Sequence, residues 1–491
     1  MFHEQGWIMK RAALSPERIA LIDIHADVRW SYKELQNRII RWASFFRGKG
    51  YRKGDRIAVY SPNKPELFAV LFACEQMGLI YVPLNWRMSR PELQALLEDC
   101  TPVLVLFDNS FEESIQGLNV AESISLSIIQ SLMMQDNWSF VVDAVRTDPW
   151  MIIYTGGTTG MPKGVMLSYE AVNWNALNTI LSWGLSEEDT TVNYMPLFHT
   201  GGLNALSIPL LMAGGSVAVG HQFDPEEALK VTNKYEATIS LFVPTMYQMM
   251  IQTECFRQSS FPSMKVFLSG GAPCPATVYR SFREKGLRFK EGYGLTEAGP
   301  NNFFIRPEDS ARKIGSVGKS MLFNEIQVLD ENGDACRKGE IGELLVKGPH
   351  VFSGYWNKPR ETSEAVQDGW LRTGDLAKVD EDGDTFIVGR KKDMIITGGE
   401  NVYPQEVEQC LINYSGIREA AVVGMADEKW GEIVVAFVVA ADEDLNNDAV
   451  IAHCRASLAT YKIPKKIVVL DELPKTHVGK IDSGYLCKML I

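Results

Sequence analysis

Apolar and polar positions alternate in helical and extended blocks through the first hundred residues of the chain. Ser31 begins a predicted helix, with Glu34 placed to complete a capping box, and a strand is expected at 56–60. Further helices and strands then alternate, at 67–77, 79–84, 89–98 and 103–107. This order is typical of a βαβαβ layer built on a parallel sheet.

The same pattern returns in the middle of the chain and again near its end. A second alternating run is expected at 216–219, 225–235, 238–243, 265–268 and 275–285. After about residue 314, short strands follow one another through Asn-Gly and Asp-Gly turns. The last hundred residues mix strands at 420–423 and 433–439 with helices at 404–411 and 448–458. We therefore predict an α/β protein: a large N-terminal domain of two α/β layers plus a small β unit, and a small α/β C-terminal domain.

Composition narrows the class of protein. The chain has 491 residues, 46% hydrophobic and 22% charged, which is typical of roughly two to four globular units. Its formal charge of −12 argues against a protein that coats nucleic acid or anionic lipid. The eight cysteines show no CxxC or CxxH spacing, so we expect reduced thiols in the cytoplasm and no zinc site. The uncharged stretch 203–220 is interrupted by polar residues and a proline, so it fits buried core better than a membrane span.

The strongest local signal is a loop rich in glycine and threonine, 154–164, which follows an apolar pair. Its glycines would let backbone N–H groups approach an anion, Thr158 and Thr159 offer hydroxyls, and Lys163 adds positive charge. It is not a Walker loop, because the lysine lies between a proline and a glycine. A surface turn without a ligand is the alternative interpretation. We expect a phosphate to bind through the loop residues Thr155, Gly156, Gly157, Thr158, Thr159, Gly160 and Lys163.

Six further motifs follow this loop or accompany it along the chain. They are PLFHTGG around His199, SGGAPCP at 269–275, GYGLTEAG at 292–299, GWLRTGD ending at Asp375, GRKKDMIITGGENVYP at 389–404 and PKTHVGK ending at Lys480. In this order, and over essentially the whole chain, the set resembles the adenylate-forming superfamily of acyl-CoA synthetases, luciferases and peptide-synthetase adenylation domains. The resemblance implies an AMP-binding N-terminal domain at 1–389, a hinge at 390–392 with Lys392 as the hinge residue, and a mobile C-terminal lid at 393–491.

The resemblance also implies a role for individual residues. The adenine slot would be bordered by Gly270, Gly271, Ala272, Pro273, Tyr293 and Gly294. Thr296 and Glu297 would contact phosphate and Mg²⁺, with Glu297 as the metal ligand, while Asp375 and Arg390 would hold the ribose. The catalytic set is Lys480, His199, Thr296 and Glu297, in which Lys480 stabilises negative charge and His199 acts as a gate beside the acyl site. CoA would pass Gly398, Gly399 and Glu400.

Each of these residues has an ordinary interpretation when it is taken alone. Tyr293 and His199 would be core residues, Glu297 and Lys480 solvated surface groups, and Asp375 a turn residue. Two positions depart from the family pattern. Gly156 stands where a serine is more usual, and Gly389 stands where many members have aspartate before the hinge arginine.

We predict an AMP-forming acyl-CoA ligase that uses ATP, CoA and Mg²⁺. The expected acyl-pocket stretches, 198–206, 242–250 and 298–304, are mostly apolar or small and contain no lysine or arginine, which favours a medium- or long-chain fatty acid. Succinylbenzoate or another aryl acid is the first alternative, and a free-standing loader of a carrier protein is the second. A non-catalytic acyl or nucleotide sensor is a third, while luciferase-like oxidation has no supporting feature. The expected partners are small molecules and not nucleic acid; a homodimer and peripheral membrane contact stay open.

Overall fold

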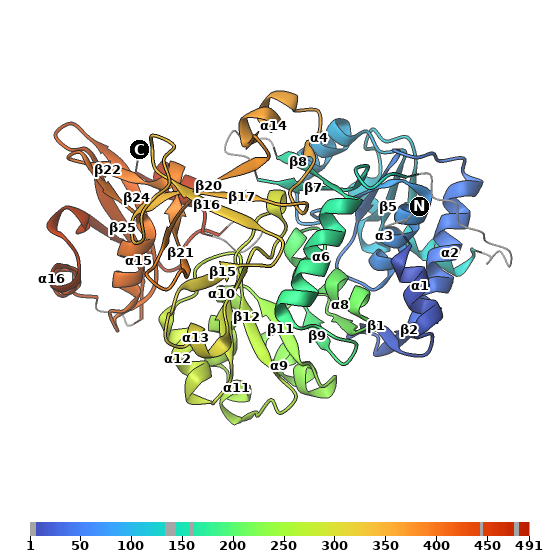
Figure 1. Cartoon of the computed structure of the whole chain (residues 1–491), viewed down its shortest axis with the longest axis horizontal. Coiled ribbons are helices and arrows are strands. Elements are labelled where there is room, and N and C mark those ends of the chain that lie inside the picture. Colours follow the sequence, from blue (N-terminus) through green and yellow to red (C-terminus); the bar gives the residue numbers. More distant parts are fainter. Residues whose placement is uncertain (1–5, 133–143, 157–161, 442–444, 476–480, 491) are drawn as a thin grey trace.

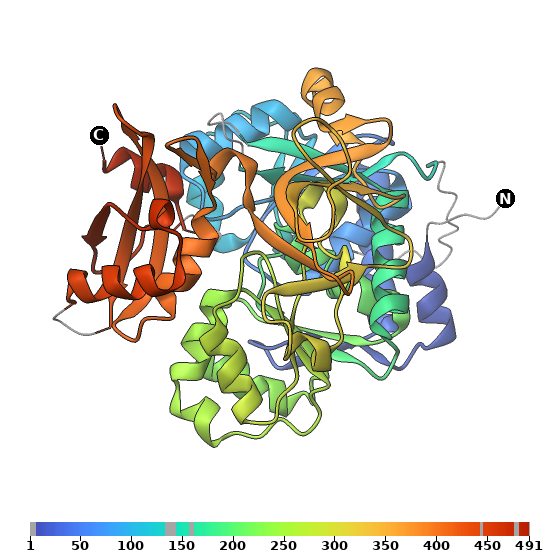
Figure 2. The same cartoon turned by 60° about the vertical axis from the view of Figure 1, so that its left-hand side comes forward.

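The computed structural model describes residues 6–132, 144–156, 162–441, 445–475 and 481–490. A large N-terminal domain carries a smaller C-terminal domain at one side, which is orange to red in Figures 1 and 2. Both domains mix helices and strands. The predicted fold class is therefore confirmed.

The first layer of the large domain is a sheet with the strand order β18-β8-β7-β4-β3-β5-β6. Its parallel strands are β3 (Arg56–Tyr60), β4 (Ile80–Leu84), β5 (Leu104–Phe107), β6 (Ser123–Ser125) and β7 (Pro149–Thr155). The strands β8 (Lys163–Ser168) and β18 (Gly354–Tyr355) extend it antiparallel. Its helices and short 3-10 turns are α2 (Tyr32–Gly48), α3 (Glu66–Met77), α4 (Arg90–Cys100), α5 (Glu112–Ile115), η1 (Asn109–Phe111) and η2 (Leu126–Gln130).

Local sequence signals predicted the elements of this layer accurately. Ser31 caps α2 and forms the predicted capping box with Glu34. The predicted bounds of β3, α3, β4, α4 and β5 agree with the structure to within two residues. The helix α3 is buried over nearly its whole surface, because it lies between the sheet and α2.

The second layer is divided between two sheets. One has the order β2-β1-β10-β9 and the other β11-β12-β13, although the sequence presented β10 to β13 as one run. The strand β10 pairs instead with the N-terminal hairpin, in the register Leu21 to Val217, and no local pattern encodes a partner so far away in the sequence. The strands are β1 (Ile19–Asp23), β2 (Val28–Ser31), β9 (Thr190–Asn193), β10 (Ser216–Val219), β11 (Ile239–Phe242), β12 (Val266–Ser269) and β13 (Phe289–Glu291).

Helices cover both of these sheets, as Figure 1 shows for α6, α8 and α9. The helices of this part are α1 (Trp7–Leu14), α6 (Tyr169–Trp183), α7 (Thr200–Leu203), α8 (Ser207–Ala213), α9 (Pro225–Lys234), α10 (Pro244–Gln252), α11 (Glu254–Gln258) and α12 (Ala276–Glu284). Apolar residues of β13, α10 and α12 form one buried cluster. The opposite face of the β11-β12-β13 sheet packs against the main core.

The predicted small β unit is a sheet with the order β14-β15-β21-β20-β17-β16, and β19 pairs with β20. The strands are β14 (Phe303–Phe304), β15 (Ser316–Ser320), β16 (Glu325–Leu329), β17 (Ile341–Lys347), β19 (Val366–Gln367), β20 (Trp370–Val379) and β21 (Thr385–Arg390). Associated turns and helices are η3 (Thr296–Ala298), α13 (Pro307–Ser310) and α14 (Pro359–Ala365). The hairpin β20-β21 carries the chain out of the large domain.

The small domain has its own sheet, β23-β22-β25-β24, with β26 parallel to β25. Its elements are η4 (Lys391–Asp393), β22 (Ile395–Thr397), β23 (Glu400–Val402), α15 (Pro404–Ile412), β24 (Ile417–Asp427), β25 (Gly431–Ala440), α16 (Asn447–Ser457), η5 (Thr460–Lys462), β26 (Lys466–Val469) and α17 (Ser483–Lys488). Both faces of this sheet bury separate apolar clusters. Within the described part of the whole chain, no helix has the length and apolar character needed to cross a bilayer.

Candidate active site

The residues predicted to hold the ribose form one hydrogen-bonded group. Asp375 and Arg390 are register partners on β20 and β21, and Asp375 Oδ1 lies 2.7 Å from Arg390 Nε. The phenol of Tyr293 donates to Asp375 Oδ2 at 2.5 Å. The Asp375 carboxylate is almost fully buried, and these donors offset part of the cost of burying its charge. Burial and the neighbouring carboxylate raise the pKa of Tyr293 well above its ordinary value, so the phenol stays a donor.

The predicted adenine ledge lies in the loop that follows β12. Gly271 has φ +86°, a conformation that favours glycine, and Gly292 N donates to Ser269 O at 2.8 Å, which brings the ledge beside the Tyr293 segment. At Gly294 a Cβ atom would lie 2.2 Å from the Pro300 carbonyl. Only glycine fits there, so backbone contacts fix the position of the motif around Tyr293.

A second group gathers residues predicted to act on phosphate and metal. The Tyr355 phenol donates to Glu297 Oε1 at 2.9 Å, and Lys163 Nζ lies 4.9 Å from the centre of the Tyr355 ring. Thr155 is the register partner of Lys163 across β7 and β8. A side chain at Gly156 would meet no heavy atom within 4 Å, so a serine would fit. Gly157, Thr158, Thr159, Gly160 and Lys480, the last predicted to be catalytic, lie outside the described residues.

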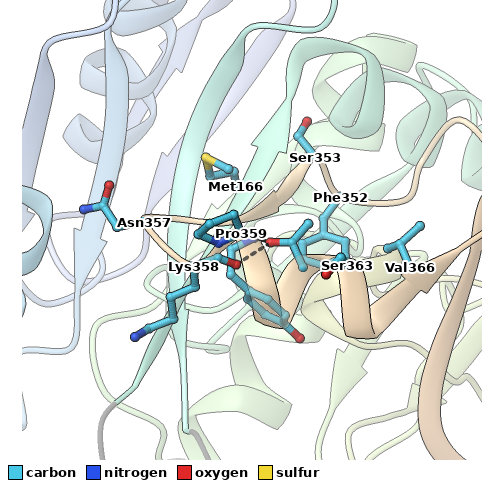
Figure 3. A pocket seen from close by; sticks show the side chains of 10 residues that line it. Met166, Phe352, Ser353, Asn357, Lys358, Pro359, Ser363 and Val366 are labelled. Carbon is cyan, nitrogen blue, oxygen red and sulfur yellow. Dashed lines mark hydrogen bonds between the residues drawn. The ribbon is translucent and has the colours of Figure 1, made fainter.

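Tyr355 also forms one wall of a cavity of about 570 Å³. Figure 3 shows Met166, Phe352 and Pro359 around it, between β8 and α14. Thr362 Oγ1 accepts the Tyr355 N–H at 2.9 Å, which ties the middle of α14 to this wall. The cavity therefore lies next to the residues predicted to act on phosphate and metal, and Tyr355 separates the two.

His199 precedes the short helix α7 and is half-buried against Phe198, with 4.5 Å between the ring centres. The turn around it is tight, because a Cβ atom at Gly202 would lie 2.2 Å from Pro196 O. Thr296 starts η3, directly before Glu297. The PLFHTGG motif thus places His199 against a buried aromatic ring, near the start of the predicted acyl-pocket stretch 198–206.

The predicted hinge residue Lys392 and the predicted CoA residues follow β21, where the chain leaves the large domain. Lys392 is exposed in η4, directly after Lys391, whose ammonium lies 3.1 Å from Glu343 on β17. Gly398 and Gly399 have φ +60° and +85° in the exposed turn between β22 and β23, and Glu400 follows them. Gly398 N donates to Trp430 O at 2.8 Å, which ties this turn to its own domain.

Comparison with known proteins decides the family. A model of the AMP-binding enzymes matches residues 8–356, and a model of the AMP-binding enzyme C-terminal domain matches residues 406–480. The chain belongs to the AMP-binding enzymes. The superfamily predicted from the motifs is confirmed, and so is the enzyme class, an AMP-forming acid–thiol ligase.

Relatives of this AMP-binding enzyme extend over almost all of its length. It is 37% identical to a feruloyl-CoA synthase from an Amycolatopsis species, covering 98% of this chain and 97% of that protein. It is 36% identical to an indoleacetate–CoA ligase from Aromatoleum aromaticum, covering 97% and 96%. A long-chain-fatty-acid–CoA ligase from Mycobacterium tuberculosis is 32% identical, again covering 97% and 96%.

The solved structures of relatives show the same architecture. The o-succinylbenzoate CoA synthetase of Bacillus subtilis, in complex with its acyl-adenylate intermediate, matches with a TM-score of 0.90 at 33% identity over 98% of both chains. The same synthetase in complex with ATP and magnesium matches with a TM-score of 0.89 at 32% identity over 99% of both chains.

Two residues that contact the predicted site motifs of this AMP-binding enzyme were not singled out from the sequence. Tyr355 lies outside every motif considered. It directly follows Gly354, whose φ of +136° marks a constrained backbone position. Glu291 is buried at the end of β13, where it accepts from Tyr279 Oη at 2.6 Å and from Cys274 N at 3.2 Å. Burial raises the pKa of Glu291 to about 7. A glutamate in a buried strand directly before the GYG motif was the available signal.

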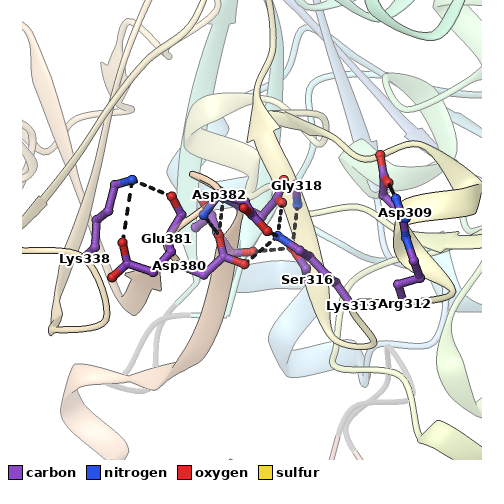
Figure 4. Close-up of polar contacts among 11 residues, drawn as sticks. Asp309, Arg312, Lys313, Ser316, Gly318, Lys338, Asp380, Glu381 and Asp382 are labelled. Atoms are coloured by element: carbon purple, nitrogen blue, oxygen red, sulfur yellow. Dashed lines mark hydrogen bonds and ion pairs between the residues drawn. The ribbon is translucent and has the colours of Figure 1, made fainter.

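A lysine of this enzyme already lies within an acidic cluster at the β20-β21 turn. Lys313 Nζ lies 2.7, 2.7 and 2.5 Å from carboxylate oxygens of Asp380, Asp382 and Asp384, as Figure 4 shows for this turn. The three aspartates lie close enough together to bind a cation. Because the ammonium takes that position, the cluster serves to anchor the turn.

Proposed function

We propose that this AMP-binding enzyme joins a carboxylic acid to CoA in two steps, in the cytoplasm. ATP and the acid first give an acyl-adenylate and pyrophosphate, and the CoA thiol then displaces AMP. The observation that carries the proposal is the Asp375 carboxylate held between Tyr293 and Arg390 at the base of the predicted hinge. A buried carboxylate with two oxygens suits two adjacent ribose hydroxyls. Within the described residues every cysteine is free, which supports the reducing compartment.

The chemistry of carboxylates explains why the reaction would need two steps. A carboxylate is a poor acyl donor because its leaving group would be oxide, whereas AMP is a good leaving group. Lys163 would bind the ATP phosphates, and Lys480 would stabilise the charge that develops as the carboxylate attacks. Glu297 fits a magnesium site, since a half-buried carboxylate beside the phosphate loop is a hard oxygen ligand. Bound magnesium would neutralise phosphate charge.

We further propose that the two steps use two positions of the small domain. Residues 1–389 would form the nucleotide and acyl site, 390–392 the hinge, and 393–491 the lid. Rotation about Lys392 would withdraw Lys480 after adenylation and bring Gly398, Gly399 and Glu400 to the CoA channel. What supports this is the separate core of the small domain and the exposed position of Lys392 between the two domains.

An aromatic or arylalkanoic acid is our first candidate substrate. The relatives that act on feruloyl and indoleacetyl groups are 37% and 36% identical, against 32% for the fatty-acid ligase. In addition, the buried amide oxygen of Asn204, within the predicted acyl stretch 198–206, has no hydrogen-bond partner among the described residues. An unpaired buried acceptor suits a ring that carries a hydroxyl or N–H donor better than a plain alkyl tail. A fatty acid is the second candidate, supported by the apolar residues of the same stretches.

The deciding experiment is a panel of aryl, arylalkanoic and fatty acids, scored for pyrophosphate release with ATP and for AMP formation with CoA. We expect release with at least one aromatic acid and CoA-dependent turnover. Lys480→Met should abolish release, whereas Lys475→Met, in the same segment, should retain it. Turnover only with a phosphopantetheinylated carrier would favour the loader, and no release with any acid would favour the sensor.

A further inference from the structure

A buried lysine lies on the strand that leads into the GYG motif. Lys290 occupies the middle of β13 and is 4% exposed. Its neighbours Phe289 and Glu291 both contact Tyr279 of α12, so alternation along the strand places Lys290 on the opposite face of the sheet. That face belongs to the main core, to which Leu268, the register partner of Lys290, also contributes.

The Lys290 ammonium lies between two aromatic rings. Its Nζ is 4.6 Å from the centre of the Trp183 ring and 4.7 Å from that of Phe304. No carboxylate or other acceptor among the described residues bonds to it, and burial lowers the pKa of Lys290 to about 7. Cation–π contacts stabilise such a group only in part, because a buried amine still needs an acceptor oxygen.

Trp183 provides a second donor in the same place. Its indole Nε1 is buried and has no hydrogen-bond partner in the described part of the chain. A buried indole N–H normally finds an acceptor. Two adjacent nitrogen donors therefore lack the same kind of partner, which is an oxygen atom.

These donors adjoin the predicted acyl site. Phe304 ends the stretch 298–304, whose residues Ala298 and Phe303 lie in the main core together with Leu203 and Leu206 of the stretch 198–206. Gly292 follows Lys290 by two residues and begins the nucleotide motif. The predicted acyl-pocket stretches contain no lysine or arginine. Lys290 lies outside them, on the neighbouring strand β13, and places a basic group at their boundary.

We propose that Lys290 and Trp183 recognise an acceptor oxygen, of a carboxylate or phenol, at the end of the acyl substrate remote from the adenylated carboxylate. This inference rests on the proposed function and names the substrate class of the same site. A plain alkyl or aryl tail would leave both donors buried without an acceptor. An acid with a distal oxygen would satisfy them, and such sites reject the analogue that lacks the oxygen.

The test compares cinnamate with 4-hydroxycinnamate and 4-carboxycinnamate, by kcat/KM for pyrophosphate release. The last two acids distinguish a phenol from a carboxylate. The proteins are the wild type, Lys290→Met, Trp183→Phe and the control Arg288→Met, which removes an exposed positive charge two residues earlier. In the wild type we expect a distal oxygen to raise kcat/KM. In Lys290→Met that advantage should fall about tenfold or more, with cinnamate itself changed less than about threefold. Trp183→Phe should lose less, and Arg288→Met nothing.

Three results would overturn the inference: no advantage of a distal oxygen in the wild type, an unchanged advantage in Lys290→Met, or equal losses for all three acids. The last would indicate a structural role. If Lys290→Met fails to fold, the Trp183→Phe series decides by the same criterion. If the wild type releases pyrophosphate from no acid, the proposed function fails. Equilibrium binding of cinnamate and 4-carboxycinnamate then tests Lys290 by itself, and equal affinities in wild type and Lys290→Met would contradict its role.

Discussion

Asp375 and Arg390 lie opposite each other on β20 and β21, and their ion pair joins the predicted ribose site to the last residue before η4. Because Asp375 is buried in the large domain, the pair holds Arg390 there. A rotation about Lys392 would then begin two residues after a fixed point. Under the proposed function, this one carboxylate would connect nucleotide binding with the movement of the small domain.

Asp375→Asn should impair ATP binding. The amide loses the negative charge that attracts Arg390, and hydrogen bonds to charged groups contribute about 1.5–3 kcal/mol, so kcat/KM for ATP should fall roughly tenfold to a hundredfold. Steady-state pyrophosphate release measures this. Asp368→Asn is the control, because Asp368 lies in an exposed turn at φ +52°, which asparagine tolerates. An equal effect of both variants would contradict the assignment.

Tyr355→Phe should weaken the phosphate and metal site without disturbing the fold. The variant keeps the ring beside Lys163 but loses the hydroxyl that donates to Glu297. We expect KM for magnesium-ATP to rise about threefold to tenfold, with little change in Tm. Tyr485→Phe, at an exposed tyrosine of α17, should change neither quantity. A normal KM in Tyr355→Phe would remove Tyr355 from the site.

Lys392→Pro should affect the second half-reaction more than the first. Proline fixes φ and would restrict the proposed rotation, while the adenylation arrangement needs no movement. Separate assays of pyrophosphate release and of thioester formation from preformed acyl-adenylate measure the two steps. Lys392→Ala should leave both near wild type. Equal losses in both assays would refute the hinge assignment.

Glu291 should make stability depend on pH. Its folded-state pKa of about 7 lies above the ordinary 4.5, so the folded protein keeps a proton that the unfolded chain releases. The free energy of unfolding should therefore fall as the pH rises from 4.5 towards 7, and level off above. Glu291→Gln cannot ionise, so between about pH 5 and about pH 8 the wild type should lose roughly 1–3 kcal/mol more than the variant.

Denaturant unfolding at the two pH values measures this difference. Glu75 and Glu408 also have a pKa raised to about 7 by burial, but they are present in both proteins, so their contributions cancel in the comparison. Parallel pH profiles for wild type and Glu291→Gln would show that Glu291 ionises normally in the folded protein.

Lys313→Ala should convert the β20-β21 turn into a cation site. Without the ammonium, Asp380, Asp382 and Asp384 repel one another, so Tm should fall. Millimolar CaCl₂ should restore Tm in the variant and leave the wild type unchanged, because the wild-type position is filled. Thermal unfolding with and without calcium checks this, and magnesium serves as the comparison ion. No calcium effect would mean that the carboxylates separate when the lysine is removed.

The sequence predicted those parts of the fold that local signals encode. The capping box at Ser31 and the apolar strand at 56–60 depend on neighbouring residues alone, and both are confirmed. The pairing of β10 with β1 depends on residues far apart in the chain, so periodicity could not reveal it.

The candidate site likewise contains residues that the sequence could predict and residues that it could not. Motif residues such as Asp375 and Tyr293 were found because their spacing matches a family, and the structure brings them together. Tyr355, Glu291 and Lys290 contact residues of other elements of the fold, and no local pattern in the sequence shows such contacts. The roles of the loop 157–160 and of Lys480 stay predictions.

During synthesis, the pairing of β1 with β10 is delayed until the chain as far as β10 has been made. Ser216 Oγ donates to Ile19 O across 197 residues of sequence, so the N-terminal hairpin leaves the ribosome long before its partner exists. At roughly 5–20 residues per second, β1 waits on the order of 10–40 s with an unpaired edge. During this interval nascent chains on neighbouring ribosomes can pair with it instead. Slower translation between β2 and β10 should therefore lower the yield of folded enzyme, and a chaperone that covers the first strand should restore it.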